Sequence, residues 1–241
     1  MSTSSPDRLE FERGLWATGL LQVAGVDEAG CGPLAGPVVA AAVVFTAEWR
    51  TGGVPEALSR LNDSKQLTEA QREEFFDLLR AMPMVRHAIV EAGVEIIDRI
   101  NIRQAAWRAM NEALDQLSPK PEHVLVDGLR IKWLPYPQTP LVKGDARSYT
   151  IAAASVLAKV TRDRLMCEYD ALYPGYGFAE HKGYGTPRHL AAIRKLGPCP
   201  IHRRSFAPFR PVEVVMDLFP DPAGAGPGKG RTGRRGRRGQ P

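Results

Sequence analysis

The sequence of 241 residues predicts an α/β fold, with a mixed β-sheet flanked by helices. Short apolar runs near residues 21–28, 37–45, 85–91 and 122–127 are typical of strands. Longer segments with helical signals lie between these runs and after them. Strands come first along the chain and helices mix with them later, an order that favours an α/β domain with a mixed sheet.

The second predicted strand indicates how the sheet is covered. Residues 37–45 are rich in valine and alanine with little polar alternation, which suits a strand covered on both faces. A polar connection follows at residues 46–62. Further along, Pro119 and Pro121 break the chain just before the strand at 122–127.

Capping signals place the predicted helices. Thr68 begins a helix that extends to about Ala81, with Gln71 as its capping-box partner. Residues 96–117 contain one or two helices, and residues 148–169 form a long one. In that long helix the small residues 152–155 would let a neighbouring element pack very closely.

The final predicted helix carries start and stop signals. Thr186 is its N-cap, Pro187 occupies the first turn, and Gly197 ends it.

The basic charge of the chain is concentrated at its end. The net charge is +5, and residues 221–241 alone carry it, so residues 1–220 are neutral overall. The remainder of that segment is mostly Gly, Pro and Ala, which predicts a disordered basic tail. Such a tail either attracts polyanions in a salt-sensitive way or is solvated without a specific role. The six basic residues are Lys229, Arg231, Arg234, Arg235, Arg237 and Arg238, against the single acid Asp221.

Other features of composition exclude several protein classes. The longest apolar stretch is too short to span a bilayer, and the polar N-terminus lacks the apolar core of a signal peptide. The three cysteines Cys31, Cys167 and Cys199 are far apart and form no Cys-x-x-Cys pair. A reduced, cytoplasmic protein with no membrane partner is therefore expected, as a monomer.

Four acids share one kind of local setting. Asp27 and Glu28 end a strand before a glycine-rich turn, and Asp127 ends another strand before glycine. Asp145 follows a glycine and precedes the long helix. Strand-end acids can converge at one edge of a sheet. Adjacent strand residues point to opposite faces, so Asp27 and Glu28 converge only if the chain turns there, which the following glycines would allow.

Each acid also has a structural explanation of its own. Asp145 could cap the following helix, and Asp127 could begin a turn, because Asp-Gly is a common turn pair. Two adjacent acids in a glycine-rich turn are harder to explain structurally, since burying them is costly without a positive partner. Oxygen-only ligands favour Mg²⁺ or Mn²⁺. Two such ions, roughly 3.5–4 Å apart, would activate water and stabilise the leaving oxygen of a phosphodiester.

The motifs resemble those of a known family. Residues 23–38, Val-Ala-Gly-Val-Asp-Glu-Ala-Gly-Cys-Gly-Pro-Leu-Ala-Gly-Pro-Val, are similar to the opening motif of bacterial ribonuclease HII, the type 2 ribonuclease H. Further matching segments follow in the family's order, and the resemblance covers about Leu21 to Pro208. They are Asn62-Asp-Ser-Lys-Gln-Leu, Val126-Asp-Gly, Val142-Lys-Gly-Asp, Ala154-Ser-Val-Leu-Ala-Lys-Val-Thr-Arg-Asp, Tyr176-Gly-Phe-Ala-Glu-His-Lys-Gly-Tyr-Gly-Thr and His202-Arg-Arg-Ser-Phe.

The resemblance implies a fold and an activity. Residues 1–20 would be an N-terminal extension, and residues 21–220 a ribonuclease H-like catalytic domain with a C-terminal helical portion. The implied activity is endonucleolytic cleavage of RNA in RNA–DNA hybrids, and cleavage 5′ of a single ribonucleotide embedded in duplex DNA. The products would carry 3′-hydroxyl and 5′-phosphate ends. The implied metal ligands are Asp27, Glu28, Asp127 and Asp145.

The resemblance also implies substrate contacts. Tyr184 matches the tyrosine that senses the 2′-hydroxyl, the only handle on a lone ribonucleotide; the alternative is a half-buried packing tyrosine. The backbone of Gly30 and Gly32 would lie against the junction nucleotide. Between them this chain has Cys31 where the family usually has a phosphate-binding arginine. Cys31 is either an oxidisable thiol or, as we expect, a passive small residue, because no activating base is near in sequence.

Several other residues have weaker indications. Lys65, Lys143 and Lys182 lie in the matching motifs and are candidates for phosphate contacts, although solvated lysines are the alternative. Cys199 and His202 have a zinc-like spacing, but without a second such pair a structural zinc site is not expected.

Two other functions fit parts of the sequence. A nucleic-acid-binding homologue with weakened catalysis would explain Cys31 and the basic tail, but the presence of all four acids argues against it. A ribonuclease HIII-like enzyme is disfavoured because about 20 residues precede the first strand, too few for an extra binding domain.

Overall fold

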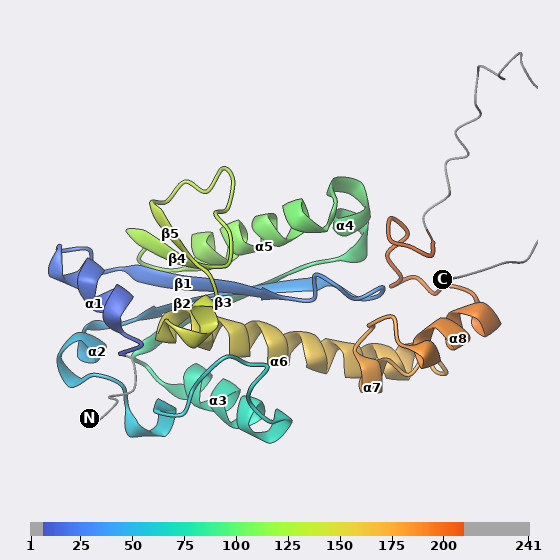
Figure 1. Ribbon diagram of the computed structural model, residues 1–241, viewed down its shortest axis with the longest axis horizontal. Helices are drawn as coiled ribbons and strands as arrows, with labels where there is room; N and C mark the ends of the chain where they lie inside the picture. Colours follow the sequence, from blue (N-terminus) through green and yellow to red (C-terminus); the bar gives the residue numbers. More distant parts are fainter. Residues whose placement is uncertain (1–6, 210–241) are drawn as a thin grey trace, which may run out of the picture. The chain divides into compact units, whose positions relative to one another are not determined.

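The computed structural model describes residues 7–209, which are organised around a five-stranded sheet (Figure 1). The spatial order is β3-β2-β1-β4-β5. β1 is antiparallel to β2, and β2 to β3, whereas β4 is parallel to both β1 and β5. The predicted mixed sheet is therefore confirmed. The strands span Val23–Ala29 (β1), Val38–Phe45 (β2), Val85–Ala92 (β3), His123–Asp127 (β4) and Gln138–Leu141 (β5).

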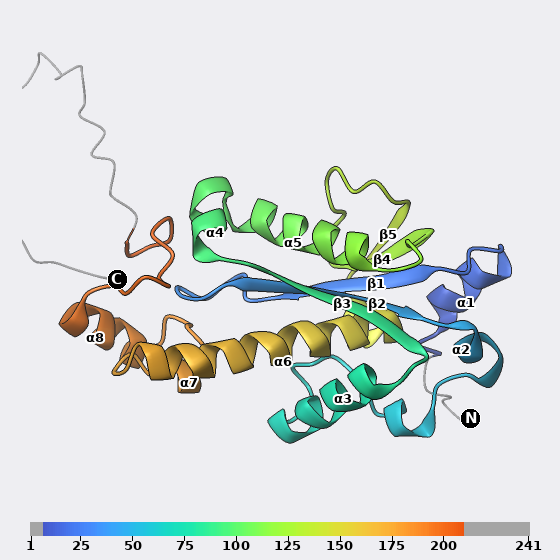
Figure 2. The same ribbon diagram turned by 180° about the vertical axis from the view of Figure 1, so that it is seen from behind.

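Helices cover both faces of this sheet. Figures 1 and 2 show α4 (Val94–Ile100) and α5 (Ile102–Gln116) on one face, and α3 (Glu69–Ala81) and α6 (Tyr149–Leu172) on the other. All eight residues of β2 are buried, as predicted from its continuous apolar run. Alternate β2 residues enter two separate cores, because successive side chains point to opposite faces.

The contact between α6 and β1 is unusually close. A Cβ atom on Gly25 would lie 2.3 Å from the carbonyl carbon of Thr150, so only glycine fits there. Ala152, Ala153 and Ala154 are fully buried in the same layer. The close packing predicted from the small residues of α6 is confirmed, and it fixes this helix beside the end of β1.

The predicted capping signals are also confirmed. The Thr68 side chain accepts from the backbone N–H of Gln71, which completes the capping box that begins α3. The Thr186 hydroxyl accepts from the backbone N–H of His189 at the start of α8, Pro187–Leu196, and Gly197 follows its end. Local hydrogen bonding thus decides these helix boundaries.

Several elements were not predicted. They are α1 (Glu10–Ala17), α2 (Ala47–Gly52), α7 (Phe178–His181), the strand β5 and two short 3₁₀ turns. β5 has only four residues and contains Pro140, which is tolerated because β5 lies at the sheet edge. α1 carries no apolar run, and a buried carboxylate, Glu12, ties it to the main core.

The C-terminal part of the described chain has its own small core. It contains Met166, Tyr176, Phe178, Ile193 and Ile201, packed between the end of α6 and α8. The basic tail predicted at 221–241 lies outside the described residues. No helix within residues 7–209 combines the length and the apolar character needed to cross a membrane.

Candidate active site

The first pair of acids lies where β1 extends beyond its neighbour. β4 pairs with β1 only as far as Val26, whereas Asp27 and Glu28 pair only with β2. The expected turn at these two acids is wrong, because the strand continues through Ala29. Their side chains therefore leave opposite faces of an open strand edge. Asp27 lies on the α6 side, next to Ser155, and Glu28 reaches a cavity on the α5 side.

The other two acids approach the same open edge from β4 and the following loop. Asp127 ends β4, and its Oδ1 accepts a 2.7 Å hydrogen bond from the backbone N–H of Gly144. Asp145 lies in the 3₁₀ turn Gly144–Ala146 and is buried. It does not cap the long helix, because Ser148 is the N-cap of α6. The structure thus brings the strand end and the loop together through the Asp127–Gly144 bond.

Burial and mutual repulsion raise the pKa of three of these acids. Burial raises the pKa of Asp27 well above its ordinary value, and repulsion from Glu28 and Asp127 adds to the effect. Burial likewise raises the pKa of Glu28, which also feels Asp127. The pKa of Asp145 is raised to about 6, mainly by burial and secondly by repulsion from Asp127. An added positive charge at this edge would therefore be strongly favoured.

One lysine faces these carboxylates. Burial alone would lower the pKa of Lys65, but attraction from Asp145, Asp27, Asp63 and Asp127 raises it. Lys65 and Asp27 line the same cavity of about 320 Å³, which reaches to Tyr184. One ammonium group cannot neutralise so many carboxylates, so the site keeps an excess of negative charge.

The carboxylate oxygens of the four acids are suitable ligands for a hard divalent cation, although the side chains are not arranged around a single ion position. Among residues 7–209, no three Asp, Glu, His or Cys side chains are arranged to hold a single ion. One oxygen of each aspartate instead accepts a backbone N–H: Asp27 from Glu28, Asp127 from Gly144, and Asp145 from Ala146. A second oxygen remains on each carboxylate. The carboxylate oxygens of these four acids are the kind of ligand that such a cation prefers.

Two buried arginines hold the glycine-rich loop that follows β1. The Arg203 guanidinium donates to the carbonyls of Gly30, Cys31, Gly36 and Pro37, at 2.6–3.2 Å. Arg162 donates to the carbonyls of Pro37, Ala35 and Lys182. These hydrogen bonds satisfy carbonyl groups of the loop that would otherwise be buried without a partner. They also fix the loop beside the acids.

No role was predicted for these two arginines, although both lie in the matching motifs. Arg162 and Arg203 are at most 1% exposed. An arginine inside an otherwise apolar helix face, as at Arg162 in α6, was the available signal. Gly30 has a φ of +102°, and a Cβ atom there would lie 2.1 Å from the Nε of Arg162. Gly30 therefore permits both the loop conformation and the arginine contact.

Cys31 lies between the loop and the acids as a neutral thiol. Its Sγ donates to Oε1 of Glu28 at 3.4 Å. Burial and then the charge of Glu28 raise the pKa of the Cys31 thiol to about 12. The thiolate needed for oxidation is therefore scarce at neutral pH. These contacts favour the passive role expected for this residue.

Tyr184 lies on the opposite wall of the same cavity. Tyr184 is 47% exposed, and its ring approaches Gly32, at which an added Cβ atom would lie 3.5 Å from ring atom Cε1. Backbone bonds to His181 and Thr186 fix its main chain. Tyr184 is thus an exposed residue on a rigid turn rather than a packing residue of the interior.

The three candidate lysines differ in position. Lys65 lines the acid-containing cavity. Lys143 is exposed in the left-handed conformation, immediately before the turn that carries Asp145. The Lys182 ammonium instead donates to the Ala179 carbonyl and lies 3.3 Å from Sγ of Cys167. The structure brings Lys65 to the acids but turns Lys182 toward α6 and α7.

The N-terminal segment supports the Asp145 turn. Arg8 donates to the carbonyl oxygens of Asp145 (2.8 Å) and Ala146 (3.1 Å). Glu12 is fully buried and accepts from the hydroxyls of Ser148 and Thr150 and from the Thr150 backbone N–H. No motif marked these residues, because their partners are about 137 positions away in the sequence.

The C-terminal histidines bond to one another rather than to the acids. His189 and His202 are 3.1 Å apart between their Nε2 atoms, and Nδ1 of His202 lies 3.1 Å from Sγ of Cys199. Burial, followed by repulsion from His189, lowers the pKa of His202 to about 4. These rings are neutral members of a small core.

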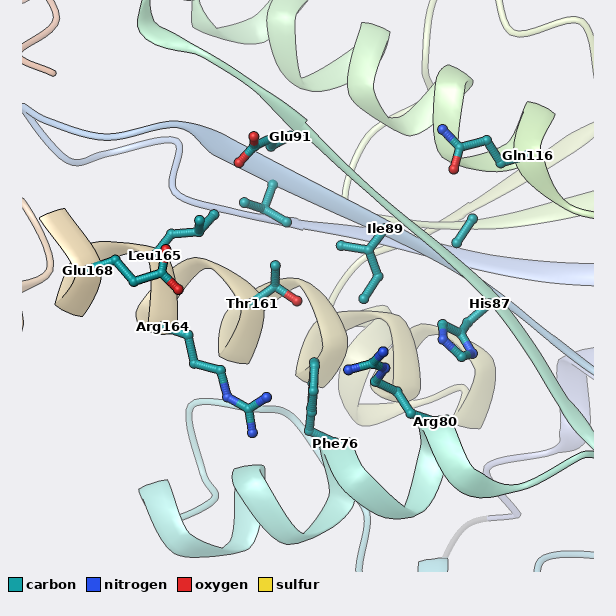
Figure 3. A pocket seen from close by; sticks show the side chains of 12 residues that line it. Phe76, Arg80, His87, Ile89, Glu91, Gln116, Thr161, Arg164, Leu165 and Glu168 are labelled. Carbon is teal, nitrogen blue, oxygen red and sulfur yellow. The ribbon is translucent and has the colours of Figure 1, made fainter.

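A larger cavity of about 730 Å³ lies away from the acids (Figure 3). It is bounded by α3, β3 and α6, where Phe76, Arg80, His87 and Arg164 point toward one another. None of the four predicted acids lines it. The volume of a cavity therefore does not locate the candidate site here. The candidate site is located by the strand-end acids.

Comparisons with known proteins identify the relatives of this chain. The family model Ribonuclease HII matches residues 24–209. Ribonuclease HII of Anaeromyxobacter sp. (strain Fw109-5) is 49% identical over 226 residues, covering 91% of this chain and 69% of that protein. The structure of ribonuclease H2 from Pyrococcus horikoshii OT3 aligns with a TM-score of 0.63 at 29% identity, covering 78% of this chain and 95% of that one.

A second solved structure extends the likeness of fold. Bst-RNase HIII in complex with Mn²⁺ aligns with a TM-score of 0.55 at 21% identity, covering 78% of this chain and 68% of that one. The predicted ribonuclease H-like sheet is thereby confirmed. With the family model matching most of the chain, the resemblance found in the motifs is confirmed too: this chain belongs to the ribonuclease HII family and is a nuclease of the hydrolase class.

Proposed function

We propose that this chain is a metal-dependent endoribonuclease, acting as a cytoplasmic monomer on RNA–DNA hybrids and on duplex DNA that contains a single ribonucleotide. The main observation is the convergence of Asp27, Glu28, Asp127 and Asp145 at the open end of β1. Tyr184 and the glycine-rich loop line one cavity together with two of these acids, Asp27 and Glu28. The site thus combines carboxylates for chemistry with a wall suited to a sugar.

The four acids are the proposed ligands of two Mg²⁺ or Mn²⁺ ions. Their raised pKa values reflect uncompensated burial and repulsion, which bound cations would relieve. When bound, these ions would lower the pKa of the attacking water and stabilise charge on the leaving oxygen. The reaction joins the water oxygen to phosphorus and breaks the bond to O3′. The products are a 3′-hydroxyl and a 5′-phosphate.

Substrate selection is assigned to the opposite wall. The Tyr184 hydroxyl would bond the ribose 2′-hydroxyl, the group that distinguishes RNA from DNA. The backbone of Gly30, Cys31 and Gly32 would contact the junction nucleotide, held in place by Arg203. Lys65 would contact a phosphate near the acids, with Lys143 and Lys182 as outer candidates. Cleavage would then occur 5′ of the ribonucleotide.

One experiment tests the proposal. Purified protein is given three duplexes of one sequence: an RNA–DNA hybrid, a DNA duplex with one ribonucleotide, and DNA alone. Each is assayed with Mg²⁺, with Mn²⁺ and with EDTA. We expect cleavage of the first two duplexes only, with metal only, and with 5′-phosphate products. Equal cutting of all-DNA duplex, or cutting in EDTA, would contradict the proposal.

Cys31 favours a second candidate function, that of a nucleic-acid-binding homologue with weakened catalysis. The family's usual arginine is absent at this loop position, which reduces the positive charge facing a phosphate. Tight binding of the single-ribonucleotide duplex without cleavage by either metal would favour this candidate. Cleavage would eliminate it.

A further inference from the structure

The largest exposed aromatic side chain of the described residues lies beside the candidate active site and has no role in it. Trp133, in the loop between β4 and β5, is 80% exposed. Its φ is +59°, a left-handed conformation that is unfavourable for a bulky residue. Both the exposure of the indole and this backbone conformation cost free energy. Features of this kind are concentrated at binding sites.

Basic residues surround this indole. Trp133 packs edge-on against Trp107 of α5, with ring centroids 6.4 Å apart. Arg103 and Lys132 line the same hollow of about 460 Å³, and no acid lines it. Arg130 lies with Lys132 and Trp133 in an adjoining hollow. We call these five residues the Trp133 surface.

The charges of the Trp133 surface are not neutralised within the described chain. None of the six ion pairs found in residues 7–209 includes Arg103, Arg130 or Lys132. All three side chains are exposed. By contrast, Arg108, one turn further along the same helix, pairs with Glu112. Unpaired cations beside an exposed indole complement a chain of phosphates and apolar sugar faces.

The Trp133 surface is continuous with the acids. The cavity that contains Glu28 and Asp127 is also lined by Arg103 and Trp107. Those two residues line the neighbouring hollow under Trp133 as well. A duplex whose scissile phosphate reaches Asp127 would therefore continue across this surface.

We propose that the Trp133 surface binds the sugar–phosphate backbone of a duplex flank, next to the site where the duplex is cut. Trp133 packs on a sugar face, and Arg103, Arg130 and Lys132 contact phosphates. The inference rests on the proposed function for its substrate. It adds a binding surface on the α5 side of the sheet, opposite the side of Tyr184 and Lys65.

The first test uses tryptophan fluorescence, which needs no cleavage. Trp16 and Trp49 are buried and Trp107 is partly buried, so Trp133 is the most exposed of the four tryptophans and the one that a bound duplex would quench most. The single-ribonucleotide duplex is added stepwise to the protein in a buffer that contains Ca²⁺ in place of Mg²⁺. A gel then checks that the duplex has not been cut. We expect the duplex to quench wild-type fluorescence, and Trp133→Phe to lose most of that quenching. Equal quenching in wild type and Trp133→Phe would overturn the inference.

The second test measures affinity by anisotropy of the labelled duplex. Trp133→Ala should raise Kd at least about fivefold, the size of one lost aromatic contact with nucleic acid. Trp133→Gly removes the backbone strain of the left-handed conformation but should weaken binding as much as Trp133→Ala does. Trp133→Phe should weaken binding less. Lys132→Gln and Arg103→Gln should each reduce the log–log salt slope by about one. The matched controls Arg108→Gln and Leu172→Ala should bind as wild type does.

The outcomes separate this inference from the proposed function. If wild type cuts the duplex but Trp133→Ala binds it equally well, the surface is refuted and the nuclease assignment stands. If wild type cuts no duplex yet Trp133→Ala still weakens duplex binding, the surface stands alone. A loss confined to single-stranded DNA would also overturn the inference, because it commits to a duplex flank.

Discussion

Two segments bring acids to the same site, and they are held in different ways. Asp27 and Glu28 belong to β1, where strand pairing with β2 fixes every backbone position. Asp145 belongs to a short turn outside the sheet, and a side chain from the N-terminal segment, Arg8, bonds its carbonyl. The first segment is positioned by the sheet, and the second by a few long-range hydrogen bonds. Chemistry at one site therefore depends on supports of unequal strength.

The difference teaches where the site is vulnerable. We expect that a substitution near β1 must disrupt the sheet before it displaces the acids, whereas loss of the Arg8 guanidinium alone loosens the turn. Alignment of the attacking water depends on both segments, because displacement by about 1 Å can cost a hundredfold in rate. Substitutions at four positions, each compared with a control or a second variant, probe this contrast.

The largest effect is expected from Asp27→Asn. This change leaves the strand intact but removes a charge from the acid cluster, so cleavage should fall about a hundredfold or more. The melting temperature should be unchanged or higher, since burial and repulsion of Asp27 are relieved. Turnover at saturating Mg²⁺ or Mn²⁺ and thermal unfolding measure the two effects. Asp77→Asn, an exposed acid on α3, is the control; near wild-type turnover in Asp27→Asn would exclude a ligand role.

A smaller loss is expected from Arg8→Ala, which acts on the other segment. Removing the guanidinium leaves the Asp145 and Ala146 carbonyls without their donor. A charged hydrogen bond contributes roughly 1.5–3 kcal/mol when buried, so the half-exposed pair here corresponds to about a tenfold loss of turnover. Turnover and the metal concentration for half-maximal activity are measured together.

The matched control for Arg8 is Arg13→Ala. Arg13 lies in the same segment but pairs with exposed Asp7. Arg8→Lys should recover part of the activity, because an ammonium can reach one carbonyl. If Arg8→Ala and Arg13→Ala behave alike, the turn is self-supporting and the contrast between the two segments fails.

Tyr184 tests the loop side of the site. Tyr184→Phe removes one hydrogen bond, on the order of 1 kcal/mol or several-fold in rate. Tyr184→Ala also removes ring contact, roughly 1–3 kcal/mol more. Activity should fall in the order wild type, Phe, Ala, and most on the single-ribonucleotide duplex, which offers one 2′-hydroxyl. Equal cutting of that duplex by Tyr184→Ala and wild type would place the sensor elsewhere.

The smallest effect on turnover is expected at Cys31. Because burial and Glu28 raise the pKa of this thiol to about 12, its thiolate fraction at pH 8 is very small. A thiol reagent should modify the exposed Cys167 first, and peptide mass spectrometry reads the order. Cys31→Arg should tighten the binding of all duplexes similarly, since a phosphate contact does not recognise the 2′-hydroxyl. Rapid labelling of Cys31 would show a reactive thiol.

The sequence predicted those parts of the fold whose signals are local. The capping box at Thr68, the buried run of β2 and the small residues of α6 each act through neighbours in the chain or through close packing. β5 was missed because four residues containing a proline carry no strand pattern. α1 was missed because it is short and its buried face combines a carboxylate, Glu12, with only a few apolar side chains such as Trp16.

The same division holds within the site. The identity of the candidate acids followed from motifs, whereas their geometry did not. The alternation of side chains along β1 separates Asp27 from Glu28, and the site forms because the pairing of β4 with β1 stops at Val26, just before Asp27. The roles of Arg203 and Arg8 near the site depend on carbonyls more than 100 residues away, such as those of Gly36 and Asp145, and no local pattern encodes them.

The link between Glu12 and the start of α6 also bears on the order of events during synthesis. Glu12 leaves the ribosome long before Ser148 and Thr150, so its carboxylate lacks these hydrogen-bond partners until well over half the chain has been made. Closing so long a loop is slow and entropically unfavourable, so this contact forms late. The turn that carries Asp145 is then organised only after the sheet exists. A nascent or partly folded chain would therefore have its strands in place before it could cut any nucleic acid.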